Sequence, residues 1–259
     1  MSIIAFHGCS FTWGQGLQYY YLKEELGYTD KEILELSTNQ KDLVDIKNIN
    51  FEQFPKKIDD YRKAHHFPNL VSSHFDVPHI LSLQGNGGDN ESIIKRIENP
   101  HHFHLDCVQT HIVQITSPTR GSHEYTSQWH EDNWIAIDKD PMNFMWMIKA
   151  QVETIKDMLE EMNQFGQNIL FLCWFKEHAE YIKEKYPKQL IQIEYKRSIY
   201  DSFDVFTDNH DFKGEGMNIR DDFKGSDDTH FSRKAHKLVA KAIIKKIKKE
   251  KIKFNTIKV

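Results

Sequence analysis

The sequence lacks the features that mark several common classes of protein. Its 259 residues include only three cysteines, which are far apart and form no C-x-x-C pair, so no disulfide framework is expected. No run approaches the roughly 20 apolar residues that cross a bilayer. The first residues also lack a basic segment followed by an apolar one, as in a secretory signal. We therefore expect a cytoplasmic protein without disulfides and without a membrane partner.

Signatures of cofactor and metal binding are missing as well. The sequence has no G-x-x-x-x-G-K phosphate loop, and the glycines of 85–88 lack the full G-x-G-x-x-G spacing of dinucleotide-binding proteins. His101, His102 and His104 lie close together, but no second cluster of ligands has matching spacing. We interpret these histidines as part of a polar surface loop, and we expect neither a metal nor a cofactor.

The charge is unevenly distributed along the chain. Residues 233–259 hold eleven of the 34 Lys and Arg but one of the 38 Asp and Glu, a net charge of +10 that leaves −14 for the rest. A basic tail can indicate a nucleic acid or a membrane. A helix whose solvated face and C-terminal end favour lysine is the simpler interpretation, because lysine there complements the helix dipole. We expect no nucleic-acid partner, and the sequence does not indicate an oligomeric state.

The sequence does contain an alternation of strands and helices. Short apolar runs predict five strands, at 2–6, 79–83, 108–115, 168–175 and 190–193. Apolar residues at helical spacing predict helices between the strands, and Ser232 caps the last helix. This alternation predicts a single α/β domain over 1–259, with a mainly parallel five-stranded sheet covered on both faces. Insertions are expected near 23–65, 122–140 and 196–226.

Small polar residues follow the predicted strands at one edge of the sheet. Ser10, Gly87 and Ser117 come after the first three strands, and ligands bind at the carboxyl ends of parallel strands. A serine hydroxyl becomes a nucleophile when a base takes its proton and an acid orients that base. Asp227 lies three residues before His230 and supplies such a pair. Taken singly, these residues are also typical of helix caps and surface histidines, but together they favour a catalytic triad.

Three motifs resemble a known family. "GCSF" at 8–11, "GGDNESI" at 87–93 and "DDTHFSRKAHKLVA" at 227–240 resemble blocks of the SGNH or GDSL-like hydrolases, above all unassigned members encoded by bacteriophages. The resemblance implies a flavodoxin-like three-layer α/β/α sandwich with a mainly parallel five-stranded sheet. It also implies Ser10 as nucleophile, His230 and Asp227 as its partners, and the N–H groups of Ser10 and Gly87 as the oxyanion hole.

The sequence departs from the family pattern at two places. The third block of the family supplies an asparagine to the oxyanion hole, but "ITSPTR" at 115–120 contains none. Loss of such a donor can lower the rate by about 10²–10³. The candidates to replace it are Thr116, Ser117, Thr119 and Arg120. Cys9 fills the usual position of an aspartate, and we interpret it as a small buried residue.

The expected substrate is an ester or acyl compound, either a small molecule or an O-acetylated sugar or glycan. Trp129 belongs to an aromatic and polar segment, 122–140, that either stacks on sugars or packs against the body of the protein. Ser117, Thr119, Arg120 and Trp129 are the candidate substrate-binding residues, and Arg120 can hold an anionic group. The missing asparagine is also compatible with a non-catalytic binding or structural protein, for example of a phage particle.

Overall fold

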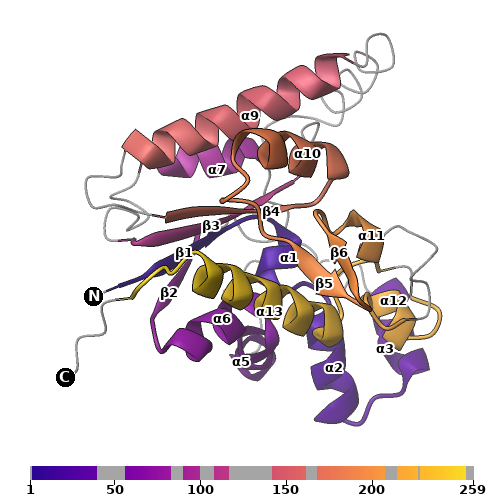
Figure 1. Cartoon of the computed structure of the whole chain (residues 1–259). Coiled ribbons are helices and arrows are strands. Elements are labelled where there is room, and N and C mark those ends of the chain that lie inside the picture. Colours follow the sequence, from indigo (N-terminus) through magenta and orange to yellow (C-terminus); the bar gives the residue numbers. More distant parts are fainter. Residues whose placement is uncertain are drawn as a thin grey trace.

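A four-stranded parallel sheet forms the centre of the protein (Figure 1). The computed structural model describes residues 2–39, 56–82, 90–99, 108–116, 142–161, 168–207, 215–226 and 228–254. The strands are β1 (Ile4–His7), β2 (His79–Ser82), β3 (Thr110–Ile115) and β4 (Asn168–Cys173), in the order β2-β1-β3-β4. Ile4 pairs with His79 on one side and Thr110 on the other, which fixes the register. Four of the five predicted strands are therefore confirmed.

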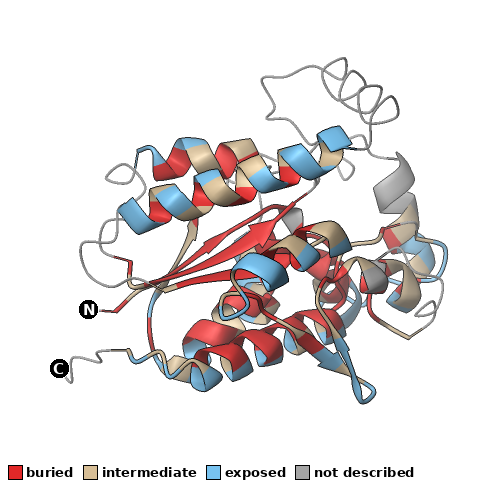
Figure 2. Cartoon of the chain, turned by 45° about the horizontal axis from the view of Figure 1, so that its top comes forward, coloured by how far each residue is buried: buried red, intermediate tan, exposed pale blue. Residues whose placement is uncertain are grey.

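Helices cover both faces of this sheet. One face packs against α6 (Phe67–Phe75) and α13 (Arg233–Lys249), and the other against α7 (Asn90–Ile97), α9 (Met142–Glu161) and α10 (Lys176–Lys185). Neighbouring residues of β1 face opposite layers, so Phe6 joins the α13 side and Ala5 the α7 side. Figure 2 shows the inner strands of the sheet buried, and the edge strand β2 is partly buried. Burial on both faces explains why these strands are continuous apolar runs in the sequence.

The prediction of a fifth strand in this sheet is wrong. Leu190 forms only an isolated parallel bridge with Phe171 of β4. The chain then enters an antiparallel hairpin of β5 (Ile193–Tyr195) and β6 (Ser198–Tyr200). Lys196 and Arg197 at its turn have φ of 47° and 69°, the left-handed values that a two-residue type I′ turn requires. The N–H of Ile191 donates to the carbonyl of Phe171 at 2.8 Å and Ser202 forms an isolated bridge with Cys173, but the described residues form no continuous fifth strand.

The predicted insertions are largely helical where they are described. The first two helices after β1 are α1 (Ser10–Trp13) and α2 (Leu17–Glu24), and α3 (Asp30–Asn39) and α5 (Lys56–His65) follow in the first insertion. The third holds β6, α11 (Asp204–Thr207) and α12 (Ile219–Asp222). The second, 122–140, lies outside the described residues. None of the described helices has the length and apolar character of a membrane-spanning segment.

Local signals placed two helices correctly. Pro68 lies in the first turn of α6, where its missing N–H has no partner to lose. Ser232 caps α13, and its hydroxyl oxygen accepts a hydrogen bond from the N–H of Ala235 at 3.2 Å. This hydroxyl also donates to the carbonyl of Gly216 at 2.5 Å, which joins the start of α13 to the preceding segment.

Candidate functional site

The carboxyl ends of β1 and β3 define the edge at which a site is expected. The strand order reverses between these two strands, so their connections leave in opposite directions, and ligands of open α/β sheets bind at such a point. Ser10 follows β1 as the first residue of α1, and Thr116 follows β3. The backbone of Ser10 belongs to the described part of the structure, whereas its side chain lies outside it. The structure thus agrees with the predicted position of Ser10 at this edge.

The turn that carries Ser10 is held from the neighbouring strand. An ideal Cβ on Gly8 would lie 2.2 Å from Thr12 Oγ1 and 2.8 Å from Gln114 Oε1, so only glycine fits. Thr12 donates its hydroxyl to Gln114 Oε1 at 2.5 Å, and Gln114 Nε2 donates to the sulfur of Cys9 at 3.1 Å. Cys9 is fully buried, as expected. Gln114, on β3, therefore positions the turn, a role that the sequence did not indicate.

The far end of α1 is also fixed. Gly14 and Gly16 have φ of +88° and +93°, which lets the chain turn sharply between α1 and α2. The guanidinium of Arg62 lies 4.0 Å from the ring of Trp13 and donates a hydrogen bond to the carbonyl of Trp13. This carbonyl is one of the groups that a helix leaves without a partner at its end. Arg62 is fully buried and pairs with Asp59 at 2.5 Å.

His230 is paired with a buried carboxylate. Its Nδ1 lies 2.6 Å from Oδ1 of Asp228, and its backbone N–H donates to the same oxygen at 2.9 Å. The side chain of Asp228 is 4% exposed and that of His230 is 19% exposed. A carboxylate acceptor at Nδ1 selects the tautomer with hydrogen on Nδ1, which leaves Nε2 with the lone pair of a general base.

The predicted acid, Asp227, lies outside the described residues, so its role stays a prediction. Sequence reasoning missed Asp228, the acid that the structure places on His230. The signal was present, because "DDTH" offers two adjacent carboxylates before the histidine. The D-x-x-H spacing predicts Asp227, the first of these two aspartates.

His230 lies against the start of α1. Its ring centroid is 4.8 Å from that of Phe11, the residue after Ser10, with the two planes tilted by 38°. An ideal Cβ on Gly16 would lie 3.7 Å from the Cβ of His230. The fold thus brings together the first turn after β1 and the loop before α13, which are at opposite ends of the chain.

Aromatic side chains surround Phe11 and form a wall beside His230. The ring of Phe11 packs against Trp174, Phe203 and Phe231, with centroid distances of 4.9, 5.4 and 4.8 Å. Trp174 directly follows β4, and its backbone N–H donates to the carbonyl of Ile115 on β3 at 3.1 Å. This wall makes the surroundings of the imidazole apolar on one side. Sequence reasoning missed it, because the run "CWF" at 173–175 indicated only the end of a strand.

The backbone around His230 is paired with the segment before it. Ile219 donates its N–H to the carbonyl of His230 at 2.9 Å, and Arg220 donates to the carbonyl of Asp228 at 2.9 Å. Asn218 and Phe231 form an antiparallel bridge. The His230 loop is therefore held on its outer side by residues of the predicted third insertion.

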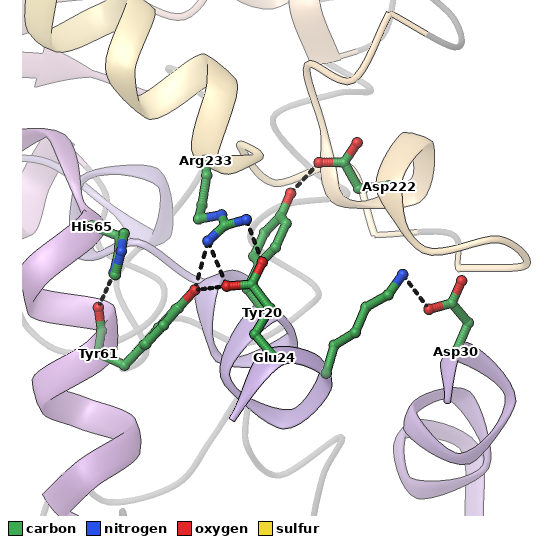
Figure 3. A network of polar contacts seen from close by, with 8 residues as sticks. Tyr20, Glu24, Asp30, Tyr61, His65, Asp222 and Arg233 are labelled. Carbon is green, nitrogen blue, oxygen red and sulfur yellow. Dashed lines mark hydrogen bonds and ion pairs between the residues drawn. The ribbon is translucent and has the colours of Figure 1, made fainter. Parts of the chain in front are cut away.

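A polar network fixes the start of α13 to the N-terminal helices (Figure 3). Arg233 donates from Nη1 to Oε2 of Glu24 at 2.7 Å, and its Nη2 bonds the other oxygen of the same carboxylate. Nη1 also bonds the hydroxyl of Tyr61 at 2.8 Å, and that hydroxyl donates to Glu24 at 2.8 Å. Such a bidentate pair has one preferred geometry. The network therefore limits the movement of α13 close to His230.

The electrostatics of this network keep its ion pair charged at neutral pH. Burial raises the pKa of Glu24, but the hydrogen bonds from Tyr61 and Arg233 outweigh it and lower the pKa overall. Burial and the hydrogen bond to Glu24 raise the pKa of Tyr61 to about 12. Beside the network, Tyr20 donates to Asp222 and lies with its ring 4.4 Å from the guanidinium of Arg233.

Comparisons with protein-family models, with curated proteins and with solved structures found no match for this chain.

A second histidine near the site is uncharged at neutral pH. His236 on α13 is fully buried, and its Nδ1 accepts the backbone N–H of Phe67 at 3.2 Å. Burial, and to a lesser degree the nearby His230, lowers the pKa of His236 to about 3. His236 therefore carries no positive charge at neutral pH.

The end of β3 is occupied by a buried asparagine. Asn90, the first residue of α7, accepts the backbone N–H of Thr116 at 2.8 Å and its hydroxyl at 3.2 Å. The Nδ2 of Asn90 donates to the carbonyl of Thr116 at 3.1 Å and to Gln151 Oε1 at 2.7 Å. Both donors of Thr116 thus face Asn90. Thr116, one of the residues expected to supply the missing oxyanion donor, does not do so in this arrangement.

Several predicted site residues lie outside the described part of the structure, and their roles stay predictions. They are Gly87, Ser117, Thr119, Arg120 and Trp129, together with the histidines at 101, 102 and 104. Within the described ranges, no group of three or more His, Cys, Asp and Glu is placed to hold a metal ion.

Proposed function

We propose that this protein is a serine hydrolase of the SGNH type that cleaves an ester or acyl group. The observation that carries the proposal is the position of His230, whose Nδ1 is held by buried Asp228 and whose ring packs on Phe11, directly after Ser10. The strand order β2-β1-β3-β4 supports the proposal of a flavodoxin-like three-layer sandwich, whose order begins in the same way. The isolated parallel bridge between Leu190 and Phe171 is compatible with this proposal, although it forms no fifth strand.

In the proposed mechanism, Ser10 Oγ attacks the carbonyl carbon of the substrate and His230 Nε2 takes its proton. The backbone N–H groups of Ser10 and Gly87 stabilise the oxyanion of the tetrahedral intermediate. The intermediate collapses to an acyl-enzyme, and His230 returns the proton to the leaving alcohol. Water then attacks the acyl-enzyme by the same route and releases the acid. Asp228 takes the orienting role that the sequence assigned to Asp227.

The proposed substrate is an O-acetylated sugar or glycan. The polar and aromatic segment that follows β3 supports this choice, with Ser117, Thr119, Arg120 and Trp129 as its candidate contacts. Of the aromatic wall, Phe11, Phe203 and Phe231 are buried and Trp174 is partly exposed, so the wall offers little surface for a long acyl chain. A long acyl chain would require an extended apolar channel in addition.

Hydrolysis of matched esters tests the proposal. We expect p-nitrophenyl acetate and acetylated oligosaccharides to be cleaved faster than p-nitrophenyl palmitate. Ser10→Ala should abolish the activity, whereas Ser73→Ala, an exposed serine of α6, should retain it. Faster cleavage of the palmitate would overturn the substrate class, and equal rates for the two serine variants would overturn the mechanism.

A non-catalytic binding module, such as a structural phage protein, is the second candidate. The observation that favours it is the commitment of both Thr116 donors to Asn90, since Thr116 then does not replace the missing oxyanion donor. A binding module predicts that no ester in the panel is cleaved faster by wild type than by Ser10→Ala.

A further inference from the structure

Helix α13 presents a row of lysines to solvent. Lys237, Lys241, Lys245 and Lys249 occupy every fourth position of the helix and are exposed. We call these four residues the lysine ladder. At 1.5 Å per residue the ladder is roughly 18 Å long. The opposite side of the helix, with Val239 and Ile243, is buried in the core.

Local energetics do not account for the whole ladder. Like charges four residues apart destabilise a helix, and the ladder contains three such pairs in succession. Cations favour only the last turn of a helix, which accounts for Lys249 but not for Lys237 and Lys241. Within the described ranges, Lys245 forms an ion pair with Glu194, and the other three ladder lysines form none. All four lysines lie on the solvated face expected from the sequence, but the helix dipole favours only the C-terminal part of the row.

A cavity lies beside the ladder. It has a volume of about 130 Å³ and lies between α13 and the β5–β6 hairpin. Its lining includes Lys245 and Lys249 of the ladder, with Gln192, Glu194, Leu190 and Ile199. Ile199 is 60% exposed although it is a large apolar residue. Apolar surface with a few convergent hydrogen-bonding groups is what a sugar ring with its hydroxyls needs.

We propose that the lysine ladder and this cavity bind a carboxylate-bearing polysaccharide, the polymer from which the Ser10 site removes acyl groups. This inference rests on the proposed function, because it takes the acylated substrate of the Ser10 site from it. Helix α13 starts three residues after His230, so the Lys237 end of the ladder is the end nearer to the site, and the cavity lies at the other end. The charge distribution supports the docking, because residues 1–232 carry a net −14 and repel a polyanion from other faces.

Two features favour a polysaccharide over a nucleic acid. Residues 232–253 contain no Phe, Tyr or Trp on which bases could stack. Arginine is the residue that clamps phosphate and guanine in bidentate fashion, and the single arginine of α13, Arg233, is bound to Glu24. Lysines act as point charges and suit a flexible carboxylate polymer.

Direct binding to the full chain tests the proposal. Ser10→Ala protein is titrated with labelled alginate oligosaccharide, with a neutral maltooligosaccharide and with duplex DNA, at roughly 0.02 M and 0.5 M salt. The ladder variant carries Lys237→Gln, Lys241→Gln and Lys249→Gln. The control carries Lys57→Gln, Lys149→Gln and Lys224→Gln, which remove the same charge from exposed positions elsewhere. We expect alginate to bind about tenfold more weakly to the ladder variant than to the control.

The outcomes separate clearly. Alginate binding that weakens with salt, fails with the neutral sugar and is reduced only in the ladder variant supports the proposal. Equal binding to the ladder and control variants, equal binding of the neutral sugar, or tighter binding of DNA overturns it. Hydrolysis plays no part in these titrations, so their failure is distinct from failure of the proposed function, which the ester panel reports separately.

Discussion

Replacing Asp228 by asparagine tests how His230 is oriented. Oδ1 of Asp228 accepts both Nδ1 of His230 at 2.6 Å and its backbone N–H at 2.9 Å, within a side chain that is 4% exposed. Asparagine keeps the shape but removes the charge that stabilises the imidazolium formed during attack. It also removes the preference for the tautomer with hydrogen on Nδ1. Comparable changes in serine hydrolases lower turnover by up to about 10⁴. We expect a loss of about 10²–10⁴, or about 3–5 kcal/mol of transition-state stabilisation.

The assay is the initial rate on p-nitrophenyl acetate, with thermal unfolding measured on the same samples. Loss of a buried, charged acceptor should lower the free energy of unfolding by about 1–3 kcal/mol, so the variant should remain folded at 25 °C. Asp227→Asn is the matched control, because it removes the same charge from the adjacent residue. We expect its rate to stay within about twofold of wild type. A large loss in Asp227→Asn together with a small one in Asp228→Asn would refute the assignment of Asp228.

Three further predictions concern stability. Gly8→Ala should lower the free energy of unfolding by about 1–3 kcal/mol, because the added Cβ would overlap Thr12. Calorimetry should show a lower Tm, and an unchanged Tm would contradict this prediction. Burial lowers the pKa of His178 to about 3, against about 6.5 in the unfolded chain. The unfolded state therefore binds the extra proton between these values, and stability falls as pH falls below about 6.5. Between pH 7 and pH 5 the free energy of unfolding of the wild type should fall by about 2 kcal/mol more than that of His178→Leu, as measured by urea unfolding. Parallel pH curves for the two proteins would contradict this prediction. Ser232→Ala should cost about 1–2 kcal/mol through loss of the α13 cap, whereas Ser198→Ala on the exposed hairpin should change little.

The parts of the fold that were predicted correctly are those encoded locally. Strands β1, β3 and β4 are buried on both faces, and the edge strand β2 is partly buried, so each appears as a short apolar run in the sequence. The hairpin after Leu190 was missed because its turn uses Lys196 and Arg197 in left-handed conformations, where the usual signal is Asn-Gly. Pairing within this hairpin then removed the expected fifth strand.

The site was predictable to a similar extent. The position of Ser10 after a buried strand and the place of His230 before the last helix follow from short motifs. Gln114 and Trp174 were not predictable, because their contacts depend on which strands are neighbours in the sheet. The choice between two adjacent aspartates is decided by the conformation of one loop, which spacing alone does not encode.

The most direct test of the account is covalent labelling of Ser10 with a fluorophosphonate, since the reagent reacts only with a serine whose proton is removed by a base. Wild type and the variants Ser10→Ala, His230→Ala and His74→Ala are incubated with the probe, and the modified peptide is located by mass spectrometry. The account predicts a single label on Ser10 in wild type and in His74→Ala, none in Ser10→Ala, and a greatly slowed reaction in His230→Ala. Absence of label on Ser10 in the wild type, or equal labelling of wild type and His230→Ala, would contradict it.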